Sequence, residues 1–207
     1  MGNPKLTEPL LRWNKVTEML EMSQVGRVTD AREICTVINA AAQIYRGIIP
    51  DDCWHEPYMS VKELHQELED GVVFSGIYQE GELLAVMGFQ VRGGVELIRH
   101  AYVSPQHQRT GMGRTLLRWI HRQASAPILV GTWAGASWAI RFYENNGYHL
   151  MNPGDTAQLL ETFWRVPKRQ AEASVVLARG QALAVLRIAG EAQLGTITTA
   201  DRIDSLD

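Results

Sequence analysis

The 207-residue chain has little cysteine, no long apolar run and no large surplus of either charge. Its two cysteines, Cys35 and Cys53, form no C-x-x-C pair, so neither a disulfide framework nor a zinc ribbon is indicated. No stretch approaches the roughly 18 consecutive apolar residues of a membrane-spanning helix. The first 24 residues carry charged side chains where a signal peptide needs an apolar core. We therefore expect a cytoplasmic protein without a membrane segment.

The charge balance excludes a second group of functions. There are 20 Lys and Arg against 23 Asp and Glu, a formal net charge of -3, so no general basic field is available for nucleic acid or an anionic membrane. With 45% hydrophobic and 21% charged residues the composition is that of an ordinary globular domain. The expected partner is a small molecule.

The most informative segment present is the glycine-bearing turn from Gln108 to Gly113, between an apolar run ending at Val103 and an amphipathic run beginning near Arg114. Glycines let bare backbone N–H groups converge, and the following helix adds the positive end of its dipole, so the turn is suited to a phosphate. It is not a dinucleotide fingerprint, because Leu116 stands where the third glycine belongs, and it lacks the P-loop pattern. A plain strand-to-helix turn is the open alternative.

Apolar spacing and turn residues predict a mixed fold of strands and helices. Strands are expected at 25–28, 72–78, 83–91, 95–103, 128–133, 148–151 and 174–178, and helices at 31–45, 61–69, 114–124, 137–144 and within 154–165. The strands at 72–78, 83–91 and 95–103 have short connections and should form an antiparallel meander. A strand-helix-strand order makes 128–133 parallel to 95–103. The expected class is α/β (α+β), with a mostly antiparallel mixed sheet of about 6–7 strands.

The order of two motifs resembles the GNAT superfamily of acyl-CoA N-acyltransferases. Gln108-x-x-Gly111-x-Gly113 follows a strand ending in Val103, and a helix, a strand and the segment AIRFYENNGY at 139–148 come after it. The resemblance implies that strands 95–103 and 128–133, the fourth and fifth, splay apart. It covers about 24–179, leaving an N-terminal extension at 1–23 and a tail of uncertain structure at 180–207. The segments at 53–59 and 131–133 resemble an uncharacterised bacterial branch.

The resemblance implies acetyl-CoA as co-substrate. Its pyrophosphate is expected on the glycine turn, at a helix N-terminus, and its pantetheine arm beside the fourth strand. The cofactor-binding residues that follow are Ala101, Tyr102, Val103, Gln108, Arg109, Thr110, Gly111, Met112, Gly113 and Arg114.

Catalytic roles follow from the same resemblance. Tyr143 falls at the position of the general acid. For the base, Glu96 and His100 on the fourth strand are both candidates, although Glu96 points to the other face unless a bulge shifts the register. A water-relayed proton transfer to His55 or Glu56 is another alternative.

An acceptor site is expected near the loop between the first two helices. Its predicted residues are Trp54, His55, Glu56, Tyr58 and Trp133, an aromatic and mixed-polar lining suited to a small amine or a peptide terminus. No metal is expected, because Met59 stands where the second histidine of H-E-x-x-H belongs.

The sequence thus predicts an N-acetyltransferase that transfers an acetyl group directly from acetyl-CoA to a primary amine of a small molecule or peptide. A noncatalytic acyl-CoA-binding or sensing module is the alternative. A homodimer also stays open, as does a role of the tail in assembly with a partner.

Overall fold

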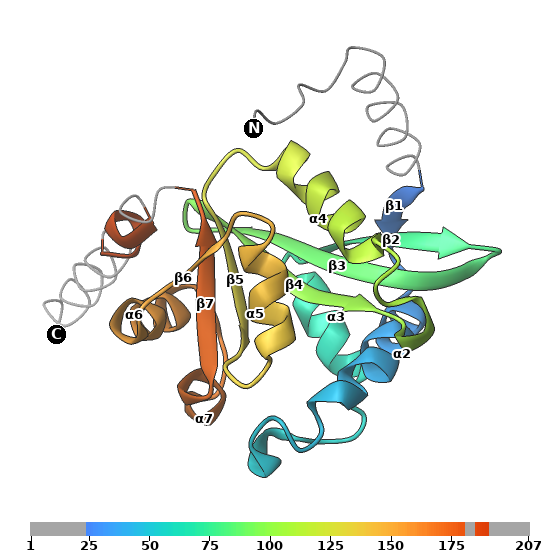
Figure 1. Ribbon diagram of the computed structural model, residues 1–207, viewed down its shortest axis with the longest axis horizontal. Coiled ribbons are helices and arrows are strands. Elements are labelled where there is room, and N and C mark those ends of the chain that lie inside the picture. The colour runs from blue at the N-terminus through green and yellow to red at the C-terminus, as the bar shows by residue number, and fades with distance from the viewer. Residues whose placement is uncertain (1–23, 181–184, 191–207) are drawn as a thin grey trace, which may run out of the picture.

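A computed structural model describes residues 24–180 and 185–190, which form one seven-stranded sheet with helices on both faces (Figure 1). The predicted extension at 1–23 and the tail residues 181–184 and 191–207 lie outside the described residues. The strands are β1 (Val25–Val28), β2 (Val73–Gln79), β3 (Glu82–Arg92), β4 (Val95–Val103), β5 (Ile128–Trp133), β6 (His149–Leu150) and β7 (Ser174–Arg179). The helices are α2 (Ala31–Ala42), α3 (Val61–Glu69), α4 (Met112–Gln123), α5 (Ser137–Glu144), α6 (Pro153–Phe163) and α7 (Lys168–Glu172).

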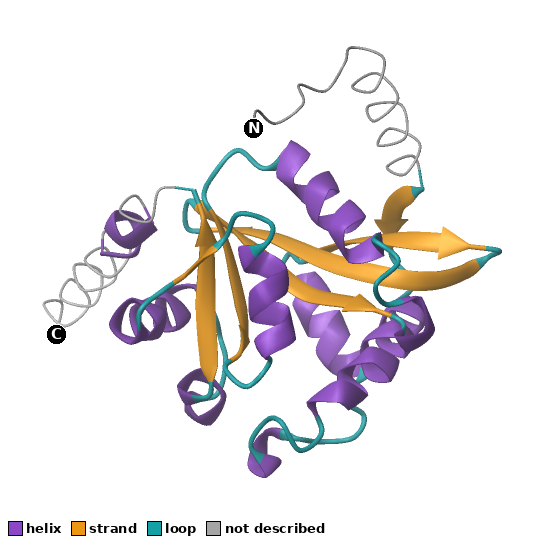
Figure 2. Cartoon of the chain, in the orientation of Figure 1, coloured by secondary structure: helices purple, strands orange, loops and turns teal. Residues whose placement is uncertain are grey.

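The helices divide between the two faces of the sheet (Figure 2). On one face, apolar residues of α4 and α5, such as Leu117 and Tyr143, pack on Ile98 and Val130. On the other face, α2 and α3 pack on β2 and β3, and α6 packs on β5 and β7. Each helix buries one stripe, as its 3.6-residue period predicts.

Strand order and direction confirm the predicted fold class. The order is β1-β2-β3-β4-β5-β7-β6, with β4 and β5 parallel and the other neighbours antiparallel. The parallel ladder ends at the pair Ile98 and Val130, although both strands continue. Beyond that pair the two strands separate, as expected.

Some boundaries differ from the expectation for local reasons. The helix predicted over 31–45 ends as α-helix at Ala42 and continues as a 3₁₀ turn over Gln43–Tyr45. Helix α4 begins earlier than predicted, because Gly111 at φ 97° is its N-cap. Helix α7 was not predicted; it is a five-residue helix directly after Pro167.

Part of the tail packs on the domain. Residues 185–190 are helical, and Val185 and Ala189 are fully buried in a cluster with Leu159 and Phe163 of α6. Within the described ranges, no helix is both long and apolar enough to cross a membrane.

A histidine at the end of α4 makes stability depend on pH. The Nε2 atom of His121 lies 2.9 Å from the Tyr148 hydroxyl. Burial, and then the charge of Arg179, lower the pKa of His121 to about 4. The folded protein therefore keeps this imidazole neutral in a range where the unfolded chain protonates it.

We expect the free energy of unfolding to fall as pH drops from about 6.5, the ordinary pKa of histidine, to about 4. In that window the unfolded state binds a proton that the folded state excludes. His121→Gln removes this proton uptake, so the free energy of unfolding of the variant should fall less between pH 7 and about pH 4. Urea denaturation at several pH values measures the slope. His149→Gln, at an exposed histidine of β6, should keep the wild-type slope, and equal slopes for all three proteins would contradict the assignment.

Candidate active site

The glycine turn ends in a helix N-terminus that no side chain caps. Gly111 has the left-handed φ of 97° and is the N-cap of α4, where no side-chain hydrogen bond satisfies the first N–H groups. Arg109, just before it, also has a positive φ of 66°. Unpaired N–H groups at a helix N-terminus favour an anion.

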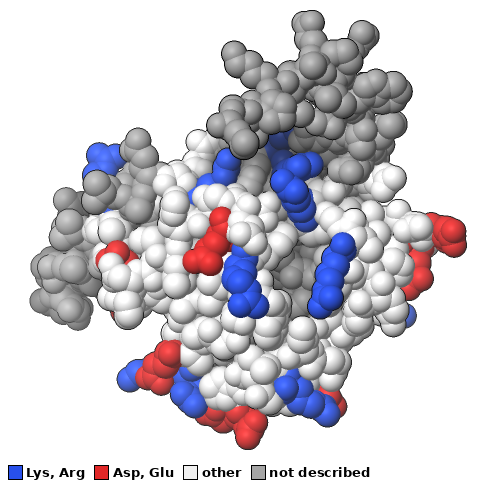
Figure 3. Space-filling view, viewed as in Figure 1, with Lys and Arg blue, Asp and Glu red and all other residues white. Residues whose placement is uncertain are grey.

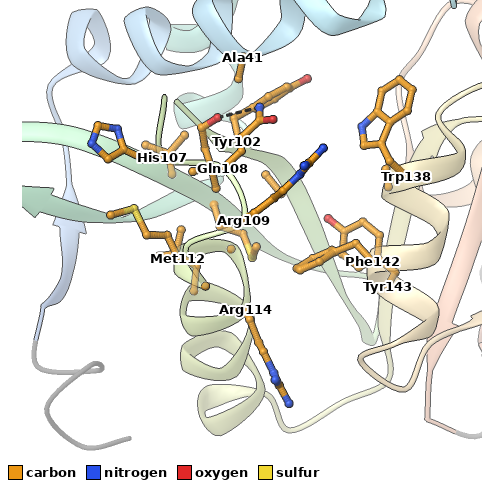
Figure 4. A pocket seen from close by; sticks show the side chains of 18 of the residues that line it. Ala41, Tyr102, His107, Gln108, Arg109, Met112, Arg114, Trp138, Phe142 and Tyr143 are labelled. Atoms are coloured by element: carbon orange, nitrogen blue, oxygen red, sulfur yellow. Dashed lines mark hydrogen bonds between the residues drawn. The ribbon is translucent and has the colours of Figure 1, made fainter. Parts of the chain in front are cut away.

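The turn borders a cavity of about 630 Å³, here called the glycine-turn cavity (Figure 4). It lies where β4 leaves β5, between the N-terminus of α4 and α5. Nine of the ten predicted cofactor-binding residues line it: Ala101, Tyr102, Val103, Gln108, Arg109, Gly111, Met112, Gly113 and Arg114. The tenth, Thr110, does not; its hydroxyl donates a 2.6 Å hydrogen bond to the His107 carbonyl.

The strand beside this cavity has a free edge. Ala101, Tyr102 and Val103 lie beyond the last pair of the β4–β5 ladder. On its other side β4 stays paired with β3, through Tyr102 with Val86 and Val103 with Ala85. An extended, amide-bearing ligand can occupy such a free edge as an added strand would.

Basic side chains accompany the turn. Arg109 and Arg114 line the cavity, and Figure 3 shows Lys and Arg side chains on both sides of a hollow in this face. Together with the positive end of α4 they make the site electrostatically suited to phosphate groups.

Tyr143 projects from α5 into the glycine-turn cavity. Figure 4 shows its hydroxyl directed toward the space beside Arg109, while its ring packs edge-on against Phe142 and Tyr148. Burial, with smaller effects of Tyr148 and Tyr45, raises the pKa of Tyr143 well above its ordinary value. The hydroxyl is therefore protonated at neutral pH and can donate a hydrogen bond.

A second cavity, of about 750 Å³, lies on the α3 side of β4 and is called the His100 cavity here. Segments far apart in the sequence line it, among them residues of α3, the bulged part of β4, the end of β5 and the end of α6. Its polar and aromatic lining includes His55, Tyr58, Glu63, Glu67, Arg99, His100, Thr132, Trp133, Trp164 and Arg165.

A β-bulge directs His100 into this cavity. Between the pairs Val86–Tyr102 and Gly88–Arg99, β4 has two residues, His100 and Ala101, opposite a single residue of β3. His100 adopts a φ of 49° and stacks on Phe74, with ring centroids 6.0 Å apart. Without the extra residue, strict alternation would turn this imidazole toward α4.

Glu96 lies elsewhere. The bulge comes after it in the strand, so its register is not shifted, and it lines neither cavity. Its buried carboxylate accepts hydrogen bonds from the backbone N–H of Ser125, at 2.9 Å, and from the Ser125 hydroxyl, at 3.2 Å. The structure does not bring Glu96 together with the other predicted catalytic residues.

Only some of the predicted acceptor residues line the His100 cavity. His55, Tyr58 and Trp133 line the His100 cavity, and the Trp133 indole donates a 2.9 Å hydrogen bond to the Tyr58 hydroxyl. Trp54 does not line it; its ring lies against Tyr58 and under the Arg46 guanidinium. Glu56 forms an exposed ion pair with Arg46.

Two tyrosines form the boundary between the cavities. Tyr45 and Tyr102 line both, and the Tyr102 hydroxyl is hydrogen-bonded to those of Tyr45 and Tyr58. Burial raises the pKa of Tyr102 well above its ordinary value and that of Tyr45 to about 12. The boundary is thus a neutral, hydrogen-bonded wall.

Several lining residues were missed at the sequence level. His107 and Phe142 line the glycine-turn cavity, and Glu67 and Arg99 line the His100 cavity. The i, i+4 spacing of Glu63 and Glu67 indicates that both lie on one face of α3. It does not indicate which part of the sheet this face contacts. In the described ranges, no group of three or more His, Cys, Asp or Glu side chains is arranged to hold a metal ion.

Comparison with known proteins agrees with this architecture. Residues 70–150 match the family model of the acetyltransferase (GNAT) domain. PaiA N-acetyltransferase of Thermoplasma acidophilum, solved in complex with coenzyme A, is 14% identical, with a TM-score of 0.57 over 76% of this chain and 98% of that one. The ribosomal-protein-S18-alanine N-acetyltransferase of Escherichia coli is 16% identical, with a TM-score of 0.52 over 75% and 91%.

A curated relative extends beyond the matched region. The UPF0157 protein YqkA of Bacillus subtilis (strain 168) is 29% identical over 158 residues, which make up 74% of this chain. The match spans 45% of that relative's length. The match of residues 70–150 to this family model confirms the resemblance inferred from the sequence, and the solved structures share the fold.

The two glycines of the turn should respond differently to alanine. Gly111→Ala forces a side chain into a φ of 97° and should lower the free energy of unfolding by about 1–3 kcal/mol. At Gly113 an added Cβ would meet Phe142 and Val103 at ordinary distances of 3.6–3.7 Å, and the backbone is helical. Gly113→Ala should therefore match the wild type or exceed it by up to about 1 kcal/mol. Denaturation of the two variants measures the difference, and a Gly111→Ala variant as stable as wild type would contradict this view of the turn.

Proposed function

We propose that this protein is an acetyl-CoA-dependent N-acetyltransferase that acts on a primary amine of a small molecule or peptide in the cytoplasm. The observation that carries the proposal is the junction of two cavities at Tyr45 and Tyr102, beside the free edge of β4. One cavity suits a phosphate-bearing donor, and the other suits an amine.

The glycine-turn cavity has the features that coenzyme A requires. The uncapped N-terminus of α4 and the side chains of Arg109 and Arg114 suit the pyrophosphate. The free edge at Ala101–Val103 suits the amide groups of the pantetheine arm. A GNAT neighbour solved with coenzyme A supports the same donor. When bound, the thioester supplies the acetyl group.

The His100 cavity has features that suit a cationic amine. The aromatic rings of Tyr58, Trp133 and Trp164 and the carboxylates of Glu63 and Glu67 line it. Aromatic faces and carboxylates both attract ammonium groups. At pH 7 only roughly one alkyl amine in 2,500 is uncharged, so a base must be at hand to supply the nucleophile.

His100 and Tyr143 are assigned complementary roles in this proposal. His100 lines the acceptor side and takes one proton from the amine as the new C–N bond forms. Tyr143 lines the donor side and gives its proton to sulfur as the C–S bond breaks. The products are an N-acetylated amine and free coenzyme A. Glu96 receives no proton-transfer role, because Ser125 holds its carboxylate outside both cavities.

Tyr143→Phe should lower kcat by about 100-fold while leaving acetyl-CoA affinity within about twofold of wild type. The expected loss is at the low end for a general acid, because a thiol with a pKa near 8.5 is already a good leaving group. The ring and its packing on Phe142 and Tyr148 are retained. Thiol release from acetyl-CoA, measured with spermidine, phenylethylamine, lysine and an alanyl tripeptide, gives kcat, and calorimetry gives the affinity.

The matched control is Tyr78→Phe, which removes a hydroxyl that is hydrogen-bonded to Glu33 outside both cavities. It should retain wild-type kcat. If wild-type protein binds acetyl-CoA but no amine raises thiol release above background, the noncatalytic acyl-CoA-binding module is the better description. Equal rates for Tyr143→Phe and wild type would remove Tyr143 from the mechanism.

A further inference from the structure

A carboxylate on α3 faces the imidazole that the bulge directs into the His100 cavity. The Oε2 atom of Glu67 lies 3.3 Å from Nε2 of His100, and the two side chains are only 24% and 16% exposed. Sequence analysis did not single out Glu67, because nothing in the helical pattern indicates what this face of α3 contacts. The contact joins a helix and a strand that are 33 residues apart in the chain.

The backbone at His100 is held in an uncommon conformation for this contact. A φ of 49° is unusual for a residue other than glycine. Such conformations cost about 1–3 kcal/mol and persist where the surrounding structure holds them, often at functional sites. Here the paired residues on either side of the bulge and the stacking on Phe74 hold the imidazole toward Glu67.

The contact has a consequence for the two ring nitrogens. Burial favours the neutral acid in Glu67, but the adjacent His100 side chain, together with Arg99, lowers its pKa below the ordinary value. An ionised carboxylate accepts hydrogen bonds and cannot donate them, so the proton between the two groups belongs to Nε2. The lone pair of a neutral imidazole is then on Nδ1. Nε2 itself is buried, and its 3.3 Å contact with Glu67 is an ion-pair contact without standard hydrogen-bond geometry.

We propose that Glu67 is a positioning residue for acetyl transfer: its carboxylate holds the His100 proton on Nε2, so that Nδ1 receives the proton of the acceptor amine. This inference rests on the proposed function, in which His100 is the base. The proton balance is complete within the pair, because Nδ1 gains one proton as the amine nitrogen loses it. The resulting imidazolium is stabilised by the Glu67 carboxylate.

The charges around the pair determine the direction of the pH effect. Glu63 and Glu67 face this region from α3, Arg92 from β3 and Arg99 from β4, and the connecting segments add Asp70, His55 and Arg165. The Arg99 guanidinium donates to Glu67 at 2.7 Å and to Gln90 at 3.0 Å. Without the Glu67 charge, His100 would face Arg99 uncompensated, and its protonated form would be disfavoured.

The experiment compares Glu67→Gln, Glu67→Asp and the control Glu161→Gln in the full-length protein. Glu161 is an exposed residue of α6 outside both cavities, so the control makes the same chemical change at a site away from the proposed proton transfer. Circular dichroism and thermal unfolding verify the fold. Thiol release with the four named amines is measured across pH 5–9, and the tautomer of His100 is determined by ¹⁵N NMR of histidine-labelled protein.

We expect Glu67→Gln to lower kcat by about 10- to 100-fold with acetyl-CoA affinity unchanged. The lower limb of its pH profile should move to lower pH, and His100 should lose its preference for the Nε2–H form. Glu67→Asp keeps the charge and should therefore retain part of the wild-type kcat and part of the preference for the Nε2–H form. Should Glu67→Gln fail to fold, Glu67→Asp still carries the test, through an intermediate shift in tautomer and rate.

Failure of the inference and failure of the proposed function have different signatures. If wild-type protein transfers acetyl groups but Glu67→Gln matches Glu161→Gln in pH profile and tautomer, Glu67 only joins α3 to the sheet through Arg99, and the inference is overturned. If wild-type protein acetylates none of the amines, the transferase proposal and the proton transfer assigned to Nδ1 both fail. The NMR comparison then still decides whether Glu67 sets the tautomer.

Discussion

The site depends on the early end of the parallel ladder between β4 and β5. Only the pairs from Glu96–Ile128 to Ile98–Val130 hold the two strands together, after which each strand follows its other neighbour. β4 stays with β3, and β5 stays with β7 along its whole length. A continuous sheet would have no room at its centre for a ligand, because side chains and backbone would close it. The separation creates both cavities while each strand still satisfies its backbone on one side.

The two cavities differ because the two faces of the sheet are built differently. The face of α4 and α5 contributes a helix N-terminus, glycines and arginines, which suit an anion. The opposite face contributes α3, whose Glu63 and Glu67 line the His100 cavity, and the aromatic residues of the loop after α2. Tyr45 and Tyr102 belong to both cavities, so the two chemistries meet at one hydrogen-bonded pair of side chains. The catalytic assignment of His100 and Tyr143 is a proposal that follows from this division.

Much of the fold could be predicted from the sequence, because it follows from short-range patterns. The strand Val95–Val103 and the helix Val61–Glu69 have the predicted limits, and the strand-helix-strand order determined the parallel pair. The glycine turn was recognisable for the same reason, since its residues are contiguous. Pairings between distant segments were not predictable in this way. Glu67 has no signal of its own, and whether Glu96 or His100 faces a cavity depended on one unpaired residue in β4 whose position the alternation does not reveal.

That unpaired residue also makes β4 intolerant of small changes in length. Before the bulge, Ile98 faces α4 and Arg99 faces α3; after it, Ala101 packs on the α4 side and Tyr102 on the α2 side. A deletion of one residue between Arg99 and Tyr102 would restore perfect alternation and keep a complete β3–β4 ladder. It would also leave the one remaining residue of the bulge facing α4, so that Tyr102 keeps its side but no imidazole enters the His100 cavity. A more regular strand would therefore give a sheet that is as well hydrogen-bonded but has no imidazole beside Glu67.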